Sequence, residues 1–273
     1  MSAFAPERIV CLTEETTETL YLLGEERRIA GISGYTVRPA RARREKPRIS
    51  AFTSANIEKI AALRPDLILG FSDLQADIAR ELIRRGFNVL VFNQRTVAEI
   101  IGMIRMLASI VGASERGEAL VKELQANLES IRGAAERFPR RPRVYFEEWD
   151  EPMISGIGWV SELVHVAGGI DVFPELARSP GAKERIVADP AEVVRRAPDI
   201  IAASWCGKKF RPERVRSRPG WSRVPAVCDG ELHEIKSAEI LQPGPAALSD
   251  GVRRLHDIFA AWAARAPHAA TVA

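Results

Sequence analysis

Short apolar runs alternate with amphipathic segments along the first part of the chain. The apolar runs have the length of buried strands, and they cover residues 8–12, 29–33, 67–71 and 88–93. The segments between them show helical spacing, and the predicted helices cover residues 13–23, 56–63 and 76–85. Helices that alternate with short apolar strands are typical of a parallel sheet with helical crossovers.

A long helical pattern occupies the middle of the chain. Residues 97–111 are predicted to be helical, and Gly112 interrupts the pattern. Residues 115–138 then continue as one helix, because apolar residues such as Leu120 and Leu124 follow one stripe. At about 1.5 Å per residue this helix spans roughly 36 Å, which exceeds what one crossover needs. We therefore expect a strut that joins two lobes.

The alternation restarts after residue 142. The predicted strands are residues 143–147, 199–204 and 226–227, and the predicted helices are residues 159–166, 190–196 and 245–264. The sequence LRPDLI at 63–68 recurs in kind as RAPDII at 196–201, which indicates an internal repeat. The predicted fold class is α/β, with two lobes that each hold a central parallel sheet flanked by helices, joined by a long helical strut. The expected domains are an N-terminal lobe (1–96), connecting helices (97–138) and a C-terminal lobe (139–273).

Composition narrows the class of protein and its compartment. No window holds the ~18 uninterrupted apolar residues that a membrane span needs. The N-terminal residues lack the basic start and apolar stretch of a secretory signal, so we expect a cytoplasmic protein, or a periplasmic one whose leader has been trimmed. Three cysteines are too few for a disulfide framework and suit a reducing compartment.

Aromatic residues gather in the loops that follow the predicted strands. In open parallel sheets, ligands bind beyond the carboxyl ends of the strands, and aromatic rings offer a large contact area with little entropy to lose. Any single ring could equally be core packing. The aromatic residues of these loops are Tyr35, Phe52, Phe71, Trp149, Trp159, Trp205 and Phe210.

No catalytic constellation emerges, so we expect no catalytic residues and no metal ligands. The carboxylates around Glu147, Glu148 and Asp150 could do acid–base chemistry, but a polar loop beside Trp149 is the favoured reading. No His-x-x-x-His or Cys-x-x-Cys spacing occurs, and no glycine-rich phosphate loop is present. Cys11 and Cys206 follow strands and could touch a metal, although a lone cysteine more often packs as a small hydrophobe.

Several of these segments together resemble one family over residues 8–262. The segments are RIVCLT at 8–13, TTETL at 16–20, GISGY at 31–35, NIEKI at 56–60, LRPDLI at 63–68 and AGG at 167–169. They are similar to the class III substrate-binding proteins of ABC importers, which serve cobalamin, haem and ferric siderophores, and most of all to the cobalamin-binding members. The resemblance implies two lobes of sheet and helices joined by the long helix.

The same resemblance implies residue roles. Tyr35, Phe52 and Trp221 match positions where cobalamin binders place aromatic contacts, although Phe52 replaces a Trp. Glu58 matches a first-lobe glutamate that docks onto transporter arginines. Near Trp221 the only acid is Glu213. A missing second docking glutamate, with the missing signal, favours a cytosolic relative that stores its ligand or hands it over.

Two basic runs, which include Arg38 and Arg211, fall in loops expected to border the cleft. Arginines that converge from two sides would favour an anionic ligand through charge-assisted hydrogen bonds. The alternative interpretation is a pair of solvated loops. No recognition-helix pattern accompanies the basic residues, so a nucleic-acid partner is not expected.

The sequence therefore predicts a monomeric, non-catalytic binder of a metal chelate, chiefly a cobalamin-like corrinoid, held in the cleft between the lobes with no covalently bound cofactor. It would serve uptake or intracellular handover, with an ABC importer permease as a partner through Glu58. The expected ligand contacts are Tyr35, Phe52, Trp149, Trp159, Trp205, Trp221, Arg38 and Arg211. The alternatives are a haem or ferric-siderophore binder, a ligand-sensing module, and a chelatase-like or metallocofactor enzyme using Glu147, Glu148, Cys206 or His233.

Overall fold

The computed structural model describes residues 5–265, and these form two compact units. Unit 1 holds the chain up to Gln125 together with Gln242–Ala246. Unit 2 holds Ala126–Leu241 and the chain from Ala247 onward. The chain therefore returns briefly to unit 1 near its end, which no pattern in the sequence indicated.

Unit 1 is built on a five-stranded, fully parallel sheet in the order β3-β2-β1-β4-β5. The strands are β1 (Ile9–Cys11), β2 (Ile29–Ser33), β3 (Arg48–Ser50), β4 (Leu67–Phe71) and β5 (Val89–Phe92). The helices are α1 (Glu14–Leu22), α2 (Ala42–Glu45), α3 (Ile57–Ala62), α4 (Ala76–Arg84) and α5 (Val97–Ile110), with short 3₁₀ turns η1 (Glu26–Arg28) and η2 (Asp73–Gln75).

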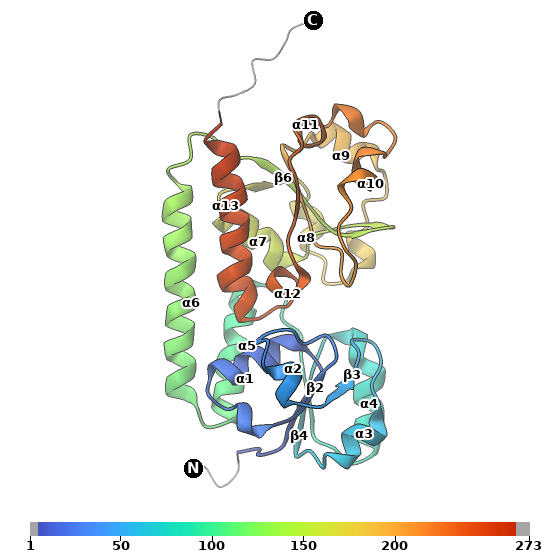
Figure 1. Ribbon diagram of the computed structural model, residues 1–273, viewed down its shortest axis with the longest axis vertical. Helices are drawn as coiled ribbons and strands as arrows, with labels where there is room; N and C mark the ends of the chain where they lie inside the picture. Colours follow the sequence, from blue (N-terminus) through green and yellow to red (C-terminus); the bar gives the residue numbers. More distant parts are fainter. Residues whose placement is uncertain (1–4, 266–273) are drawn as a thin grey trace, which may run out of the picture. The chain divides into compact units, whose positions relative to one another are not determined.

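The central strands of this sheet are apolar because helices cover both of its faces. In Figure 1, α1 and α5 lie on one side of the strands and α3 and α4 on the other. Val10 and Ile68 are fully buried in the core between the sheet and its helices. Near-continuous apolar strands are what a sheet covered on both faces requires, so the sequence signal for this unit was strong.

Unit 2 contains a mixed sheet in the order β10-β9-β6-β7, with β8 also paired to β6. Its strands are β6 (Arg143–Asp150), β7 (Met153–Ser155), β8 (Ile170–Asp171), β9 (Ile200–Ala203) and β10 (Leu232–Glu234). The pairs β6–β9, β9–β10 and β6–β8 are parallel, whereas β7 folds back antiparallel to β6. The sheet is thus parallel at its centre and gains one hairpin that the sequence patterns did not predict.

The longer helices of unit 2 are α7 (Gly158–Val166), α9 (Ala191–Arg196) and α13 (Val252–Ala263). The shorter ones are α8 (Pro174–Ala177), α10 (Pro212–Arg216), α11 (Pro225–Cys228) and α12 (Ser237–Ile240), with turns η3 (Lys183–Arg185) and η4 (Trp221–Arg223) and a π-turn, η5 (Ala247–Gly251). Helices α7 and α13 pack together on one side of the sheet, and α9, α10 and α11 lie on the other (Figure 1).

Helix α6 (Ser114–Ala135) runs for 22 residues, and the boundary between the units falls inside it, after Gln125. This helix agrees with the long helix predicted over 115–138. The structure assigns α5 to unit 1 rather than to a separate connecting segment. Within the described residues, no helix has the length and apolar character needed to cross a membrane.

The internal repeat is a structural one. In unit 1, the Asp66 carboxylate accepts the Arg8 amide at 3.0 Å, and Arg8 Nε donates to the Leu63 carbonyl at 2.9 Å. In unit 2, Asp199 accepts the Arg143 amide at 2.8 Å, and Arg143 Nη2 donates to the Arg196 carbonyl at 2.7 Å. Each unit therefore ties the end of a helix to the start of two neighbouring strands with the same arginine–aspartate pair.

The backbone repeats as well. The residues before the two Pro-Asp turns, Arg64 and Ala197, have φ of 46° and 42°, the left-handed conformation that commonly ends a helix.

One short segment that was predicted to be a strand is helical. Residues 226–227 were expected to be a strand, but they lie in α11, which begins at Pro225. Proline is favoured in the first turn of a helix, because its fixed φ suits the helix and its missing N–H is not needed there. The strand at this edge of the sheet is β10, five residues further on.

Candidate functional site

The loops after β1, β2, β3 and β4 lie at one edge of the unit 1 sheet, and buried hydrogen bonds join them. Gln75 is 1% exposed and links three of these segments. Its amide donates to the Phe52 carbonyl at 2.8 Å and to the Leu12 carbonyl at 3.5 Å, and its oxygen accepts the Phe71 amide at 3.0 Å. One side chain thus fixes the loop carrying Phe52 against the ends of β1 and β4.

Three predicted ligand contacts lie in these unit 1 loops. Tyr35 is 56% exposed on the loop after β2, so its ring is free to meet a ligand. Phe52 is half-buried on the loop after β3. Arg38 is partly exposed, but its Nε donates to the Glu18 carboxylate at 2.8 Å. The roles of these three residues as ligand contacts stay predictions. If Arg38 contacts a ligand, it does so while its guanidinium is paired with Glu18.

In unit 2 the accessible predicted ring is Trp149, near the end of β6. It is half-buried, its Nε1 donates to the Glu151 carbonyl at 2.8 Å, and the Lys208 ammonium lies 3.8 Å from its ring centre. A cation over the ring face holds the indole in place and adds attraction. Trp149 therefore remains a candidate for a flat ligand contact.

The other three tryptophans that were predicted to contact a ligand belong to the core of unit 2. Trp159, Trp205 and Trp221 are 3%, 2% and 0% exposed. Trp159 Nε1 donates to the Ile240 carbonyl at 2.9 Å, and Trp221 packs edge-on against Tyr145. This packing explains all three rings without a ligand and corrects the expectation that they line a binding surface.

The acidic cluster on β6 is structural. Glu147 is fully buried, and Arg218 donates to both of its oxygens, at 2.5 and 2.9 Å. Trp205 Nε1 adds a third donor at 2.9 Å. Burial raises the pKa of the Glu147 carboxyl, and these donors oppose the rise. Glu148 pairs in the same way with Arg185, which is 2% exposed.

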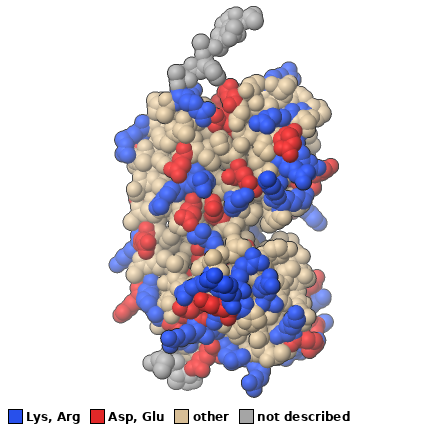
Figure 2. All heavy atoms as spheres, viewed as in Figure 1, with Lys and Arg blue, Asp and Glu red and all other residues tan. Residues whose placement is uncertain are grey.

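Three members of the basic run on unit 2 are paired with acids, whereas the ligand contact expected of Arg211 stays a prediction. Asp150 holds Arg214 at 2.7 Å and Lys208 at 3.2 Å, while Arg218 is bound to Glu147. Arg211 is exposed at the start of α10. On the face seen in Figure 2, basic and acidic side chains are intermixed over unit 2, whereas Lys and Arg gather over the region of α2 in unit 1.

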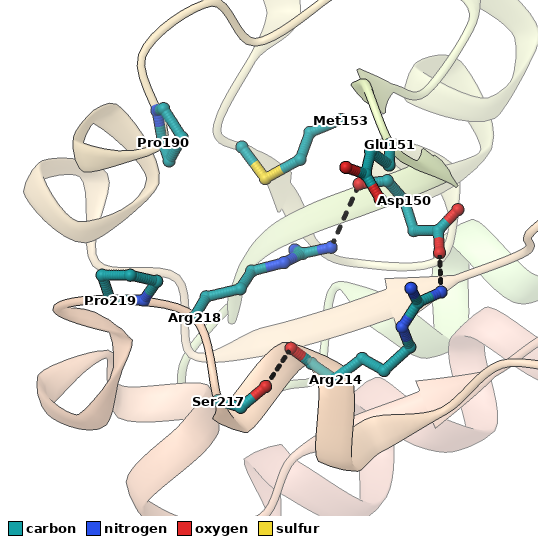
Figure 3. Close-up of a pocket in the computed structure, with 8 residues that line it drawn as sticks. All are labelled: Asp150, Glu151, Met153, Pro190, Arg214, Ser217, Arg218 and Pro219. Atoms are coloured by element: carbon teal, nitrogen blue, oxygen red, sulfur yellow. Dashed lines mark hydrogen bonds and ion pairs between the residues drawn. The ribbon is translucent and has the colours of Figure 1, made fainter.

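A pocket of about 340 Å³ lies in unit 2 beside this network. Its wall contains acidic and basic side chains together with Met153 and two prolines, and Figure 3 shows Arg218 and Arg214 each reaching toward Asp150. The lining residues are Asp150, Glu151, Met153, Pro190, Arg214, Ser217, Arg218 and Pro219. Such a wall offers hydrogen-bond donors and acceptors with little net charge.

The residues considered for catalysis do not form an acid–base or nucleophilic site. Glu147 and Glu148 are each neutralised by an arginine. His233 on β10 bonds the Glu231 carboxylate at 2.9 Å, and Cys206 lies exposed after β9. Cys11 is buried, and burial raises its pKa to about 12, so it is a thiol at neutral pH. No group of three His, Cys, Asp or Glu side chains among residues 5–265 is placed to hold a metal ion.

Unit 2 holds an acid at the position of the repeat that corresponds to Glu58 in unit 1. Glu58 lies in the first turn of α3, followed by the Pro65-Asp66 turn and β4. Glu192 lies in the first turn of α9, followed by the Pro198-Asp199 turn and β9. The sequence prediction considered only acids near Trp221 and therefore missed Glu192. The Pro-Asp repeat is the sequence signal that locates this residue.

The two glutamates differ in their surroundings. Glu58 is 78% exposed and pairs with Arg85 at 2.5 Å. Glu192 is 30% exposed and pairs with Arg195 and Arg196 at 2.5 and 2.7 Å. Glu58 therefore presents the more open carboxylate.

Two α/β units whose boundary falls within one long helix have the architecture of a two-lobed substrate-binding protein. The periplasmic binding protein family model matches residues 9–239, and the chain belongs to that family. Its members are the non-enzymatic substrate-binding components of ABC transporters, here of the class III type.

Similar proteins bind different ligands. An uncharacterized ABC transporter substrate-binding lipoprotein of Bacillus subtilis, YvrC, is 26% identical over 92% of this chain and 79% of its own length. A vitamin B12-binding protein of Vibrio vulnificus is 24% identical over 89% of this chain and 86% of its own length. The apo form of the periplasmic haem-binding protein RhuT from Roseiflexus sp. RS-1 has a TM-score of 0.77 at 21% identity, covering 92% of this chain and 98% of RhuT.

Proposed function

We propose that this protein binds a corrinoid, such as cobalamin, through the strand-end loops that carry Tyr35, Phe52 and Trp149. The ligand is bound and released without chemical change. The similarity to vitamin B12-binding proteins over most of the chain supports this proposal. Haem is the second candidate, because a haem-binding protein shares the fold.

The charge balance of unit 2 is the observation that favours the corrinoid. Its carboxylates already neutralise Arg214, Arg218 and Lys208, so these three cations are not available to meet the propionates of haem. A corrinoid presents neutral amide side chains, each a donor and an acceptor. A surface that mixes arginines and carboxylates can satisfy both without a net charge.

A calorimetric titration with cobalamin, cobinamide and haemin tests this proposal. We expect one corrinoid per chain and weaker binding of haemin. Trp149→Ala and Tyr35→Ala should each weaken corrinoid binding about tenfold, since removal of an aromatic contact costs ~1–2 kcal/mol. Phe71→Leu, at a buried ring of unit 1, is the matched control and should keep the affinity. Tight haemin binding without corrinoid binding would contradict the proposal.

We also propose that Glu58 and Glu192 dock onto basic residues of a permease, one from each unit. Both lie at equivalent positions of the repeat, and Glu58 is the more accessible. Glu58→Lys should abolish stimulation of the partner transporter's ATPase by the loaded protein, and Glu192→Lys should reduce it. Glu115→Lys, at an exposed glutamate that starts α6, is the control. Full stimulation by Glu58→Lys would exclude this docking mode.

The presence of Glu192 removes one of the two grounds for expecting a cytosolic store. The compartment remains a prediction, tested by fractionation of the native host. Recovery from the periplasmic fraction alone would contradict a cytoplasmic location.

A further inference from the structure

Three glutamates at the start of α1 are buried, which is unusual for carboxylates. Glu14, Glu15 and Glu18 are 7%, 1% and 7% exposed. They lie within five residues of one another on one helix, directly after β1. Helix α1 contacts both α5 and β2. Carboxylates in such a place require partners, because burial of a charge without compensation is costly.

Two of the three glutamates hold the loop that carries Tyr35. The Glu14 carboxylate accepts the Val37 amide at 3.3 Å. The Glu18 carboxylate accepts Arg38 Nε at 2.8 Å. Val37 and Arg38 therefore fasten the loop to α1 directly after Thr36, whose own side chain is fully buried. The position of the exposed Tyr35 ring depends on these two contacts.

The glutamates also hold the segment Gln242–Ala246, the part of the C-terminal chain that returns to unit 1. The second oxygen of Glu18 accepts the Ala246 amide at 3.1 Å. Gln94 donates to the Pro243 carbonyl at 2.9 Å. Gly244 approaches the helix so closely that an added Cβ would lie 2.5 Å from the Cβ of Glu15. One helix terminus thus fastens two segments far apart in the sequence.

Glu15 is the member of the trio with an unsatisfied atom. One of its oxygens accepts the Thr13 hydroxyl at 2.5 Å, and the other, Oε2, is buried without a partner. Gln94 Oε1, on the side chain that bonds Pro243, is likewise buried without a donor. A proton on Glu15 would remove the charge that this environment penalises and supply a donor.

The charges around the trio are unevenly placed. The cations that act on it are Arg38, paired with Glu18, and Arg43, which acts on Glu14 at longer range. Cys11 is a buried thiol beside Glu15, and Lys46 acts on Cys11. Burial raises the pKa of both Glu14 and Glu15 to about 7, and the neighbouring glutamates add to the rise. These two carboxyls therefore titrate close to neutral pH.

We propose that Glu14, Glu15 and Glu18 are positioning residues that form a proton-operated latch, which holds the Tyr35–Arg38 loop and the Gln242–Ala246 segment onto α1. With protons on Glu14 and Glu15, the latch is closed and the loop is ordered for binding. Ionisation of both places three carboxylates in one buried cluster, and their repulsion loosens the two segments.

The difference in proton binding between the native and unfolded states sets how the free energy of unfolding changes with pH. Native Glu14 and Glu15 hold their protons up to about pH 7, whereas the unfolded chain releases them near 4.5. The native state therefore binds more protons between these values, and stability falls as pH rises through this window. The contribution is fully present below pH 4.5 and lost above 7.

Carboxyl NMR and amide hydrogen exchange on the full chain test the latch without any ligand. Two glutamate ¹³C resonances should titrate with midpoints near 7, and Glu14→Gln and Glu15→Gln should each remove one. Between pH 5.5 and 8, amides of residues 34–38 and 242–246 should lose about tenfold in protection after correction for intrinsic rates. Glu15→Gln, which mimics the protonated state, should keep that protection, and the control Glu115→Gln should behave as wild type.

Midpoints near 4.5, or equal protection changes in wild type and Glu15→Gln, would overturn the latch. The effect of the latch on ligand binding rests on the proposed function, so it is measured in a separate titration with corrinoid. Corrinoid affinity should fall about tenfold from pH 6 to 8 in wild type and stay level in Glu15→Gln. If no corrinoid binds at any pH, the proposed function fails while NMR and exchange still decide the latch.

Discussion

At the scale of single residues, the sequence predicted where aromatic side chains lie along the chain but not which way they face. Tyr35 and Trp149 follow strands and remain accessible, whereas Trp205 and Trp221 are covered. Part of the cover comes from a distant strand of unit 2: Trp221 packs against Tyr145 on β6, besides lying beneath the guanidinium of the nearby Arg218. Local pattern carries no information about such long-range cover.

The buried ion pair of Glu147 gives a prediction at this scale. Glu147→Ala should destabilise unit 2 by about 3 kcal/mol, because the half-buried Arg218 would lose its counter-charge. Urea unfolding followed by tryptophan fluorescence measures the change. Glu118→Ala, which breaks an exposed pair with Arg105, should leave the midpoint unchanged. A midpoint for Glu147→Ala equal to wild type would show that the pair does not hold this core.

At the scale of elements, the apolar pattern predicted the longer strands and helices well. β2 and β4 begin and end where the pattern placed them, because strands covered on both faces are apolar throughout. The strands β3, β7 and β8 have two or three residues and were missed. Strands this short are defined by their partners, as in the β6–β7 hairpin, and leave too few positions for a periodic signal.

The arginine–aspartate tie predicts a matched pair of element-level effects. Arg143→Ala removes the donors to the Arg196 carbonyl, and Arg8→Ala removes the equivalent donors to Leu63. Each should cost about 1.5–3 kcal/mol, the range for hydrogen bonds that involve a charged group. Hydrogen exchange should report the loss in α9 for Arg143→Ala and in α3 for Arg8→Ala. A loss spread evenly over both units would contradict a local tie.

At the scale of the whole molecule, the repeat of Pro-Asp turns predicted two similar units, and the fold agrees. The repeat also locates Glu192, because residues at equivalent positions of the two units follow the same Pro-Asp turn. A search for acids near Trp221 does not reach this position. The return of Gln242–Ala246 to unit 1 had no sequence signal, since it is fixed by hydrogen bonds to Glu18 and Gln94 across more than a hundred residues.

Ligand identity is the central claim at this scale, and native mass spectrometry tests it most directly. The chain is mixed with equimolar cobalamin, cobinamide, haemin and a ferric siderophore, and the bound species is identified in the complex and after release. We expect one corrinoid per chain, recovered with its mass unchanged. A haem or siderophore adduct in its place, or a corrinoid released with an altered mass, would contradict it.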